Sequence, residues 1–165
     1  MERMVAGYYP GAIGAITQMH ANYYHRYWKF GLFFEAKVAT ELTEFLSRFE
    51  NERDGFWVIL NNEKIEGGIA IDGVRAEEKE GAHLRWFIVS PQLQGRGWGK
   101  QLLSEAISFC DRKNYRRIYL WTFEGLVTAR RLYEASAFKL VFQRTGEQWG
   151  TRVTEQCFER INPSP

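Results

Sequence analysis

The first part of the chain carries apolar residues at helical spacing. A cluster of turn-forming residues at 8–11 precedes Ile13, Ile16 and Met19, so we predict a helix over 12–24. A second amphipathic helix is predicted over 35–49. Its apolar face would consist of Val38, Leu42, Phe45, Leu46 and Phe49.

After residue 55 the pattern changes to short β-rich runs that alternate with helical segments. We predict strands over 56–60, 65–74, 83–89, 116–123, 138–144 and 151–160, and helices over 99–113 and 126–136. A charged loop over 75–81, a turn over 145–150 and a frayed tail over 162–165 complete the chain. Two helices, a β-meander and then strand–helix–strand–helix–strand–strand predict an α/β sheet of mixed direction in a single domain, 1–165.

Composition narrows the class of protein. The chain has 45% hydrophobic and 25% charged residues, as ordinary globular proteins do, and its net charge of +2 is too small to predict a nucleic-acid partner. Cys110 and Cys157 form no disulfide framework, and Cys110 falls on the apolar face of the 99–113 helix, so we predict a core residue. The histidines are not at zinc-ligand spacing with them, so no metal is predicted. No signal peptide or membrane-length apolar run is present, and a cytoplasmic location is expected.

The segment 90–100 is rich in glycine and joins a predicted strand to a predicted helix. Glycine lets the backbone turn tightly and approach a ligand closely. The first N–H groups of a helix have no intrahelical partner, and the helix dipole favours negative charge there. The segment therefore suits a pyrophosphate, although a glycine turn without a ligand is the structural alternative.

Three phosphate-binding motifs can be tested on this segment. A P-loop would need glycine where Gln94 stands and a hydroxyl residue where Gln101 stands. A dinucleotide fingerprint beginning at Gly95 would need its third glycine at Lys100. The pattern Q-x-x-G-x-G fits without a gap, at Gln94, Gly97 and Gly99.

Q-x-x-G-x-G resembles the signature of the GNAT superfamily of N-acetyltransferases. The segment 129–138, ARRLYEASAF, resembles the second signature of that family, A-x-x-L-Y-x-x-x-G-F. Ala137 stands where glycine is usual, and Leu126 stands where an asparagine is common. The resemblance covers residues 55–160 and implies a mixed, mostly antiparallel, twisted sheet flanked by helices.

The same resemblance implies acetyl-CoA as co-substrate. The strand before the glycine turn would splay from its neighbour, and its backbone at Phe87, Ile88 and Val89 would hold the pantetheine arm. Tyr133 would protonate the leaving thiolate. The pyrophosphate would be held by Gln94, Gly95, Arg96, Gly97, Trp98, Gly99 and Lys100.

Two residues are candidates for the general base. The position of the family's glutamate falls on His83, whose ordinary pKa of about 6.5 suits a base. Glu80 in the preceding loop is the rival, and His83 as a surface residue at the start of its strand is the structural alternative. Strand alternation predicts that His83, Arg85, Phe87 and Val89 share one face, opposite Leu84, Trp86 and Ile88.

A dense aromatic segment over 23–34 is the candidate wall of the acceptor groove, with Tyr24, Tyr27 and Trp28 as its binding residues. Packing of these rings between helices and sheet is an equal alternative. We expect transfer of acetyl to a primary amine by direct attack in a ternary complex; a non-catalytic acyl-CoA-binding module is the alternative. The expected partner is a small-molecule or peptide amine, with a homodimer left open and neither nucleic acid nor membrane expected.

Overall fold

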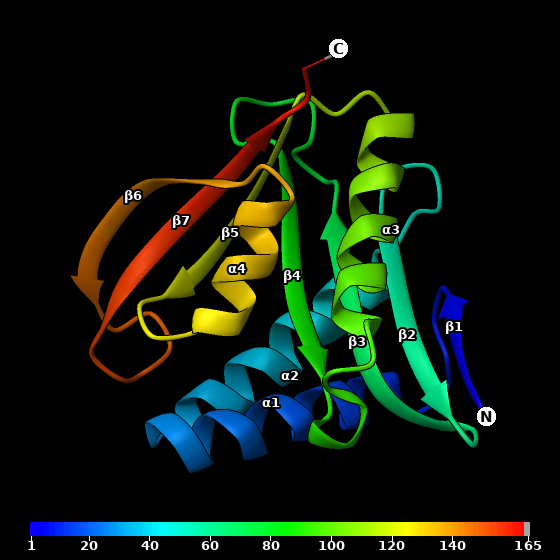
Figure 1. Cartoon of the computed structure of the whole chain (residues 1–165), viewed down its shortest axis with the longest axis vertical. Coiled ribbons are helices and arrows are strands. Elements are labelled where there is room, and N and C mark those ends of the chain that lie inside the picture. Colours follow the sequence, from blue (N-terminus) through cyan, green and yellow to red (C-terminus); the bar gives the residue numbers. More distant parts are fainter. Residues whose placement is uncertain (164–165) are drawn as a thin grey trace.

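The computed structural model describes residues 1–163 (Figure 1). The order of the sheet is β1-β2-β3-β4-β5-β7-β6, and within residues 1–163 only β4 and β5 are parallel neighbours. The predicted fold class, a mostly antiparallel sheet flanked by helices, is confirmed. The elements are β1 (Glu2–Ala6), α1 (Ala12–Trp28), α2 (Leu32–Ser47), β2 (Gly55–Asn61), β3 (Lys64–Asp72), β4 (Ala82–Val89), η1 (Pro91–Leu93), α3 (Trp98–Arg112), β5 (Arg117–Phe123), α4 (Val127–Ala135), β6 (Lys139–Gly146) and β7 (Val153–Ile161).

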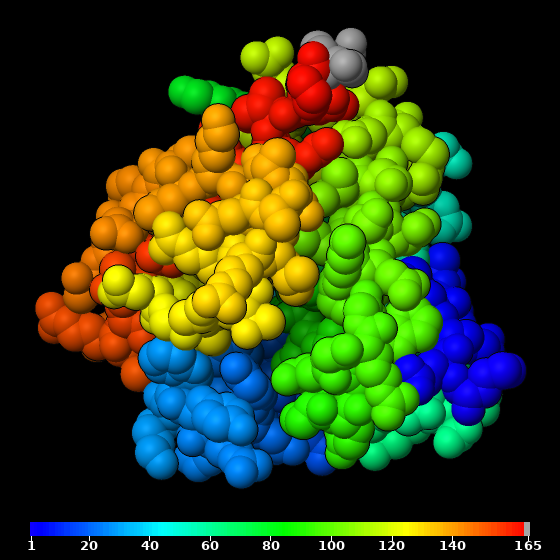
Figure 2. Space-filling view, viewed as in Figure 1, coloured from blue at the N-terminus to red at the C-terminus, as the bar shows by residue number. Residues whose placement is uncertain are grey.

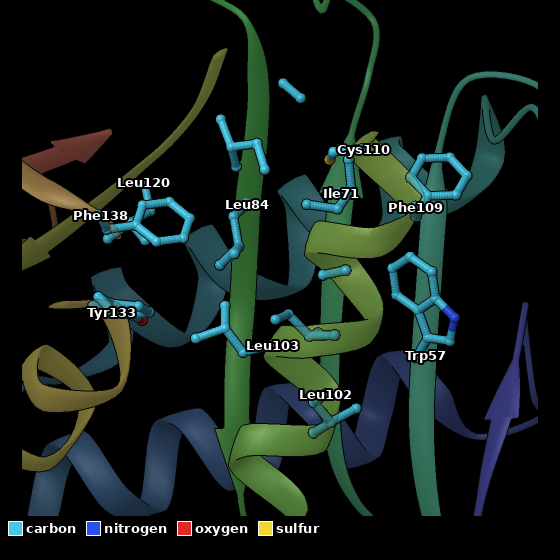
Figure 3. Packing of buried hydrophobic residues seen from close by; sticks show 14 of the residues in the cluster. Trp57, Ile71, Leu84, Leu102, Leu103, Phe109, Cys110, Leu120, Tyr133 and Phe138 are labelled. Carbon is cyan, nitrogen blue, oxygen red and sulfur yellow. The ribbon is translucent and has the colours of Figure 1, made fainter. Parts of the chain in front are cut away.

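Helices cover both faces of the sheet. In Figure 1, α3 and α4 lie on the near face, while α1 and α2 pass behind the strands. The face under α3 holds the largest apolar cluster, in which Trp57 packs edge-on against Phe109 with ring centroids 5.6 Å apart (Figure 3). Cys110 is fully buried in this cluster, which confirms its predicted place in the core.

The two ends of the chain differ from the sequence predictions. β1 was not predicted; it pairs with β2 from Glu2 opposite Asn61 to Ala6 opposite Trp57. The predicted frayed tail is wrong at Asn162, which is 7% exposed and donates its backbone N–H to the Arg116 carbonyl at 2.8 Å. Residues 164–165 of that tail lie outside the described residues.

A β-bulge in β4 reverses the predicted side-chain faces. The ladder with β3 passes from Gly68–Ile88 to Ala70–Arg85, so Trp86 and Phe87 together oppose a single residue. Trp86 has φ 48°, the left-handed conformation that lets the strand absorb one extra residue. Phe87 and Val89 therefore pack under α3 with Leu84, while Trp86 and Ile88 pack against the cluster under α1 and α2. The prediction that Phe87 and Val89 share a face with His83 is wrong because regular alternation does not continue through a bulge.

β4 and β5 separate soon after they meet. They pair only at Ala82–Ile118 and His83–Tyr119 and then diverge, as Figure 1 shows. The remaining backbone of β4 on that side has no strand partner, so its polar groups are available to a ligand. Among residues 1–163, no helix is long and apolar enough to cross a membrane, and no group of His, Cys, Asp and Glu is arranged to hold a metal.

Candidate active site

An outer cleft of about 620 Å³ lies between the end of β4, the start of α3 and the start of α4. Figure 2 shows the surface hollowed between α3, in green, and α4, in yellow. The volume is that of a pocket for an extended organic ligand. Its lining includes Phe87, Ile88, Val89, Gln94, Gly95, Gly97, Gly99 and Lys100. The structure thus brings eight of the predicted cofactor residues together on one cleft.

The start of α3 gives this cleft an anion-binding end. Gly97 is the N-cap residue at φ 86°, and its carbonyl accepts the backbone N–H of Gln101 at 3.0 Å. The N–H groups of Trp98, Gly99 and Lys100, in the first turn, therefore have no intrahelical partner. A Cβ at Gly97 would have no atom within 4 Å, so the backbone here stands open to a ligand. These donors fit the pyrophosphate of acetyl-CoA.

Arg96 and Trp98 place their side chains elsewhere. Both contact Glu2 of β1: the Arg96 guanidinium forms an ion pair with it, and the Trp98 indole N–H donates to its Oε1 at 2.6 Å. The hydrogen bond from Trp98 holds the pKa of Glu2 below its ordinary value. Neither side chain lines the outer cleft, so their contribution to a cofactor site is through the backbone. The unpredicted strand β1 thereby anchors the glycine turn.

A second, inner cavity of about 190 Å³ lies on the other side of the gap between β4 and β5. Its walls are mainly aromatic, and its charged residues are Lys37 and Glu41 from α2 and Arg85 from β4. The aromatic walls consist of Tyr24, Phe30, Phe34, Trp86, Phe87, Trp121, Phe123, Tyr133 and Trp149.

The outer cleft and the inner cavity meet where the strands separate. Tyr24, Phe87, Leu126 and Ala129 line both spaces. The two spaces are therefore neighbours that share these walls at the open edge of β4. Leu126 occupies the position of the family's asparagine, and here it supplies an apolar contact at this junction.

Tyr133 lies beside the junction. Its ring is 6.1 Å from that of Phe87, centroid to centroid, and it is 6% exposed. Burial, with a further contribution from Tyr24, raises the pKa of the Tyr133 phenol well above its ordinary value. The phenol therefore stays protonated at neutral pH and can serve as a proton donor.

The two candidate bases have different surroundings. His83 lines the inner cavity and stacks on Tyr119, with centroids 4.4 Å apart and planes at 13°. Burial lowers the pKa of His83 to about 3, so its imidazole is neutral but weakly basic. Glu80 lines neither space; its carboxylate forms an ion pair with Arg75 at 3.6 Å in the loop before β4.

The predicted acceptor residues are divided. Tyr24 lines both spaces, but Tyr27 is 57% exposed and Trp28 packs edge-on against Phe123, with centroids 4.9 Å apart. Neither Tyr27 nor Trp28 lines the outer cleft or the inner cavity. Trp28 therefore packs between the helices and the sheet, as the alternative interpretation of the aromatic segment expected.

Sequence reasoning missed the residues that α2 and the β6–β7 turn contribute. Gln148 and Trp149 of that turn line the inner cavity. Glu155, 1% exposed in β7, holds the turn by accepting the Gln148 backbone N–H at 2.9 Å and the Arg144 Nε–H at 2.8 Å. The available signal was the Trp149-Gly150 pair, an aromatic residue beside a glycine in the turn between two strands. Lys37 and Glu41 gave none, because an i,i+4 pair of opposite charges is common on solvent-facing helix surfaces.

Comparison with known proteins gives relatives of one kind. An N-acetyltransferase of Methanocaldococcus jannaschii, MJ1207, is 28% identical over 102 residues. The match covers 60% of this chain and 45% of the length of MJ1207. N-acetylaspartate synthetase of Xenopus tropicalis is 28% identical over 109 residues, 65% of this chain and 39% of its own. The chain thus spans less than half the length of these relatives.

Solved structures share the fold over nearly the whole chain. An acetyltransferase from Streptococcus agalactiae superposes with a TM-score of 0.74 at 18% identity and covers 98% of both chains. The yncA protein of Salmonella typhimurium, solved with its cofactor acetyl-CoA, gives a TM-score of 0.73 at 16% identity and covers 98% of this chain and 95% of its own. The family model "Acetyltransferase (GNAT) family" matches residues 16–138. With that match over most of its length, and with the glycine turn and the separated strands in place, the chain belongs to the GNAT acetyltransferase family.

Proposed function

We propose that this protein transfers the acetyl group of acetyl-CoA to a primary amine by direct attack within a ternary complex. The observation that carries the proposal is the junction at Phe87, a residue that lines both the outer cleft and the inner cavity. One substrate can lie on each side of the gap between β4 and β5, and their reacting atoms can meet there. Holding two reactants together in this way supplies much of the rate gain in a bimolecular transfer.

The outer cleft is the proposed acetyl-CoA site, and acetyl-CoA supplies the acetyl group. The open N–H groups at the start of α3 would bind the pyrophosphate, with Lys100 adding a positive charge. The unpaired backbone of β4 beyond His83 would orient the pantetheine arm and donate N–H groups to the charge that develops on the acetyl oxygen.

Proton transfer is assigned to groups around the inner cavity. The Tyr133 phenol donates a proton to the leaving sulfur. His83 takes the role of base, but a conjugate acid with a pKa of about 3 does not retain a proton, so we expect His83 to pass it to water. The amine acceptor is a small molecule or a peptide amine, because the inner cavity is small. The two cysteines are free and buried, which fits the proposed cytoplasmic setting.

Thermal unfolding with added ligands tests the cofactor site. A ligand that binds only the native state stabilises it by about 2.7 kcal/mol at one hundred times its Kd. We expect acetyl-CoA to raise Tm and NAD to have no effect. Gly97→Glu should abolish the shift, because it puts a side chain and a negative charge at the start of α3.

Gly7→Glu is the matched control for that substitution. Gly7 also has a positive φ, 91°, with no atom within 4 Å of a Cβ, but it lies outside the outer cleft. It should keep the shift with acetyl-CoA. No shift in the unaltered protein, or a larger one with NAD, would refute the cofactor assignment. Binding of acetyl-CoA without transfer to any amine would favour the non-catalytic module.

A further inference from the structure

The charged end of the inner cavity holds more positive than negative charge. Glu41 is the one carboxylate among the described residues that line it, and it bridges two cations. Its Oε2 is 2.6 Å from the Lys37 ammonium, and its Oε1 accepts from the Arg85 guanidinium. Both carboxylate oxygens are therefore engaged, and an incoming ammonium group would have to displace a cation to reach them.

The charged and titratable groups around Arg85 do not cancel the excess positive charge of the cavity. Asp72 lies 3.5 Å from Arg85, but Arg48 binds both oxygens of Asp72, at 3.0 and 2.6 Å. Asp72 is thus neutralised from outside the cavity. The cavity histidines, His20 and His83, are neutral at pH 7 because burial lowers their pKa values to about 4 and about 3. One positive charge from Lys37 and Arg85 remains uncompensated.

This charge is partly shielded from solvent. The side chains of Lys37 and Arg85 are 32% and 17% exposed, so their attraction for an anion is less screened than that of surface residues. Lysine and arginine so placed form charge-assisted hydrogen bonds with carboxylates. The rest of the cavity wall is aromatic and suits an apolar body. A space of about 190 Å³ is smaller than a typical pocket for a drug-sized molecule.

We propose that the acceptor is a free amino acid with an apolar side chain, whose carboxylate binds at Lys37 and Arg85 and whose amine points to the junction at Phe87. This inference rests on the proposed function and names its substrate class. The aromatic walls take the side chain of the acceptor. The carboxylate compensates the excess positive charge and fixes the amine relative to the acetyl group.

A matched set of amines tests the inference: L-phenylalanine, L-phenylalaninamide, 2-phenylethylamine and a short peptide with N-terminal phenylalanine. All four carry the same ring and a primary amine, but only the first has its carboxylate next to the amine. We expect kcat/KM for phenylalanine to exceed that for the others by about tenfold, the usual value of a hydrogen bond to a charged group. Equal or faster transfer to the amide, the amine or the peptide would overturn the inference and leave the proposed function intact.

Substitution of Lys37 separates charge recognition from differences in amine basicity. Lys37→Gln should lower kcat/KM for phenylalanine about tenfold, leave it within twofold for phenylethylamine, and leave KM for acetyl-CoA unchanged. Lys139→Gln is the control, since Lys139 is exposed in β6 and lines neither space. An equal loss for both amines would overturn the carboxylate site. No transfer to any of the four amines, with normal acetyl-CoA binding, would overturn the inference, whereas the proposed function would be overturned only if no primary amine were acetylated.

Discussion

Ala137 adopts a backbone conformation that alanine normally avoids. It follows α4 at φ 68°, and the Phe138 N–H donates to the Tyr133 carbonyl at 3.0 Å to close the end of the helix. Left-handed conformation costs a residue with a Cβ about 1–2 kcal/mol, which explains why glycine is usual at this place in the family's signature.

We therefore predict that Ala137→Gly stabilises the protein. The relief of strain exceeds the entropy that glycine adds to the unfolded chain, which leaves a gain of about 0.5–1 kcal/mol. Urea unfolding measures it. Ala135→Gly, at the last residue of α4, should instead destabilise by about 0.5–1 kcal/mol. A loss of stability in both variants would contradict the strain at Ala137.

The ring of Tyr133 packs in the core, and its hydroxyl is the proposed proton donor. Removal of the hydroxyl oxygen separates these two roles. Tyr133→Phe keeps the buried ring and removes the hydroxyl, so kcat should fall roughly 10- to 1000-fold while Kd for acetyl-CoA barely changes. Tyr115→Phe removes a hydroxyl that donates to the Arg53 carbonyl at 2.8 Å, outside both spaces, and should leave kcat unchanged. If kcat of Tyr133→Phe equalled that of the unaltered protein, Tyr133 would be a core residue only.

His20 makes stability depend on pH. It is 6% exposed, its Nδ1–H donates to the Ile16 carbonyl at 2.8 Å, and burial lowers its pKa to about 4. Between pH 6.5 and 4 the unfolded chain binds this proton and the folded chain does not, so stability falls as pH falls through that window.

The size of this effect can be measured with His20→Phe, which removes the titrating ring. From pH 7 to pH 4, the free energy of unfolding of the unaltered protein should fall by about 3 kcal/mol more than that of the variant. Parallel stability curves would show that His20 does not titrate between these values.

At the scale of elements, the sequence located helices and strands well because their apolar periods are long and regular. Long-range pairing was not readable: β1 has only a five-residue run, and its partner lies at residues 57–61. The bulge at Trp86 was not readable either, because no local residue marks where a strand gains an extra position. The glycine turn was recognised from residues 94–99, whereas the inner cavity assembles from four distant segments.

The contribution of the β6–β7 turn to the inner cavity can be tested by a substitution in β7. Glu155→Gln removes the charge that binds Arg144 and weakens the hold on Gln148, so we predict a rise of about tenfold in KM for the amine with KM for acetyl-CoA unchanged. Glu159→Gln is the control. Glu159 lies in β7, like Glu155, but its ion pair at 2.7 Å is with Arg117 of β5. Equal changes in both Michaelis constants would indicate general loosening of the fold.

At the scale of the whole molecule, the sheet consists of two parts joined at the short pairing of β4 with β5. The strands of one part are β1 to β4, and those of the other are β5, β7 and β6. The outer cleft is lined from both parts: Gly97 follows β4 in the first part, and Ala129 lies in α4, which follows β5 in the second. Ligand binding should therefore join them more firmly.

Hydrogen exchange can detect this joining. With saturating acetyl-CoA, we expect slower amide exchange at residues 94–101 and 125–132, because the ligand suppresses local opening at the cleft. In β2, which lies far from the cleft in the sheet, exchange should slow only as much as the gain in global stability requires. Slowing in β2 without slower local opening at residues 94–101 and 125–132 would show that binding raises global stability but does not join the two parts at the cleft.

The junction at Tyr24, Phe87, Leu126 and Ala129 also has a pharmacological consequence. A compound that joins the sulfur of CoA to the nitrogen of an amino acid through a short bridge would occupy both spaces as one molecule. Once one half is bound, the other sits at an effective concentration in the millimolar range, and affinity can exceed that of either half by about 10²–10⁴-fold. Because each half selects by its own chemistry, such an inhibitor would discriminate between relatives that share the cofactor but differ in their amine.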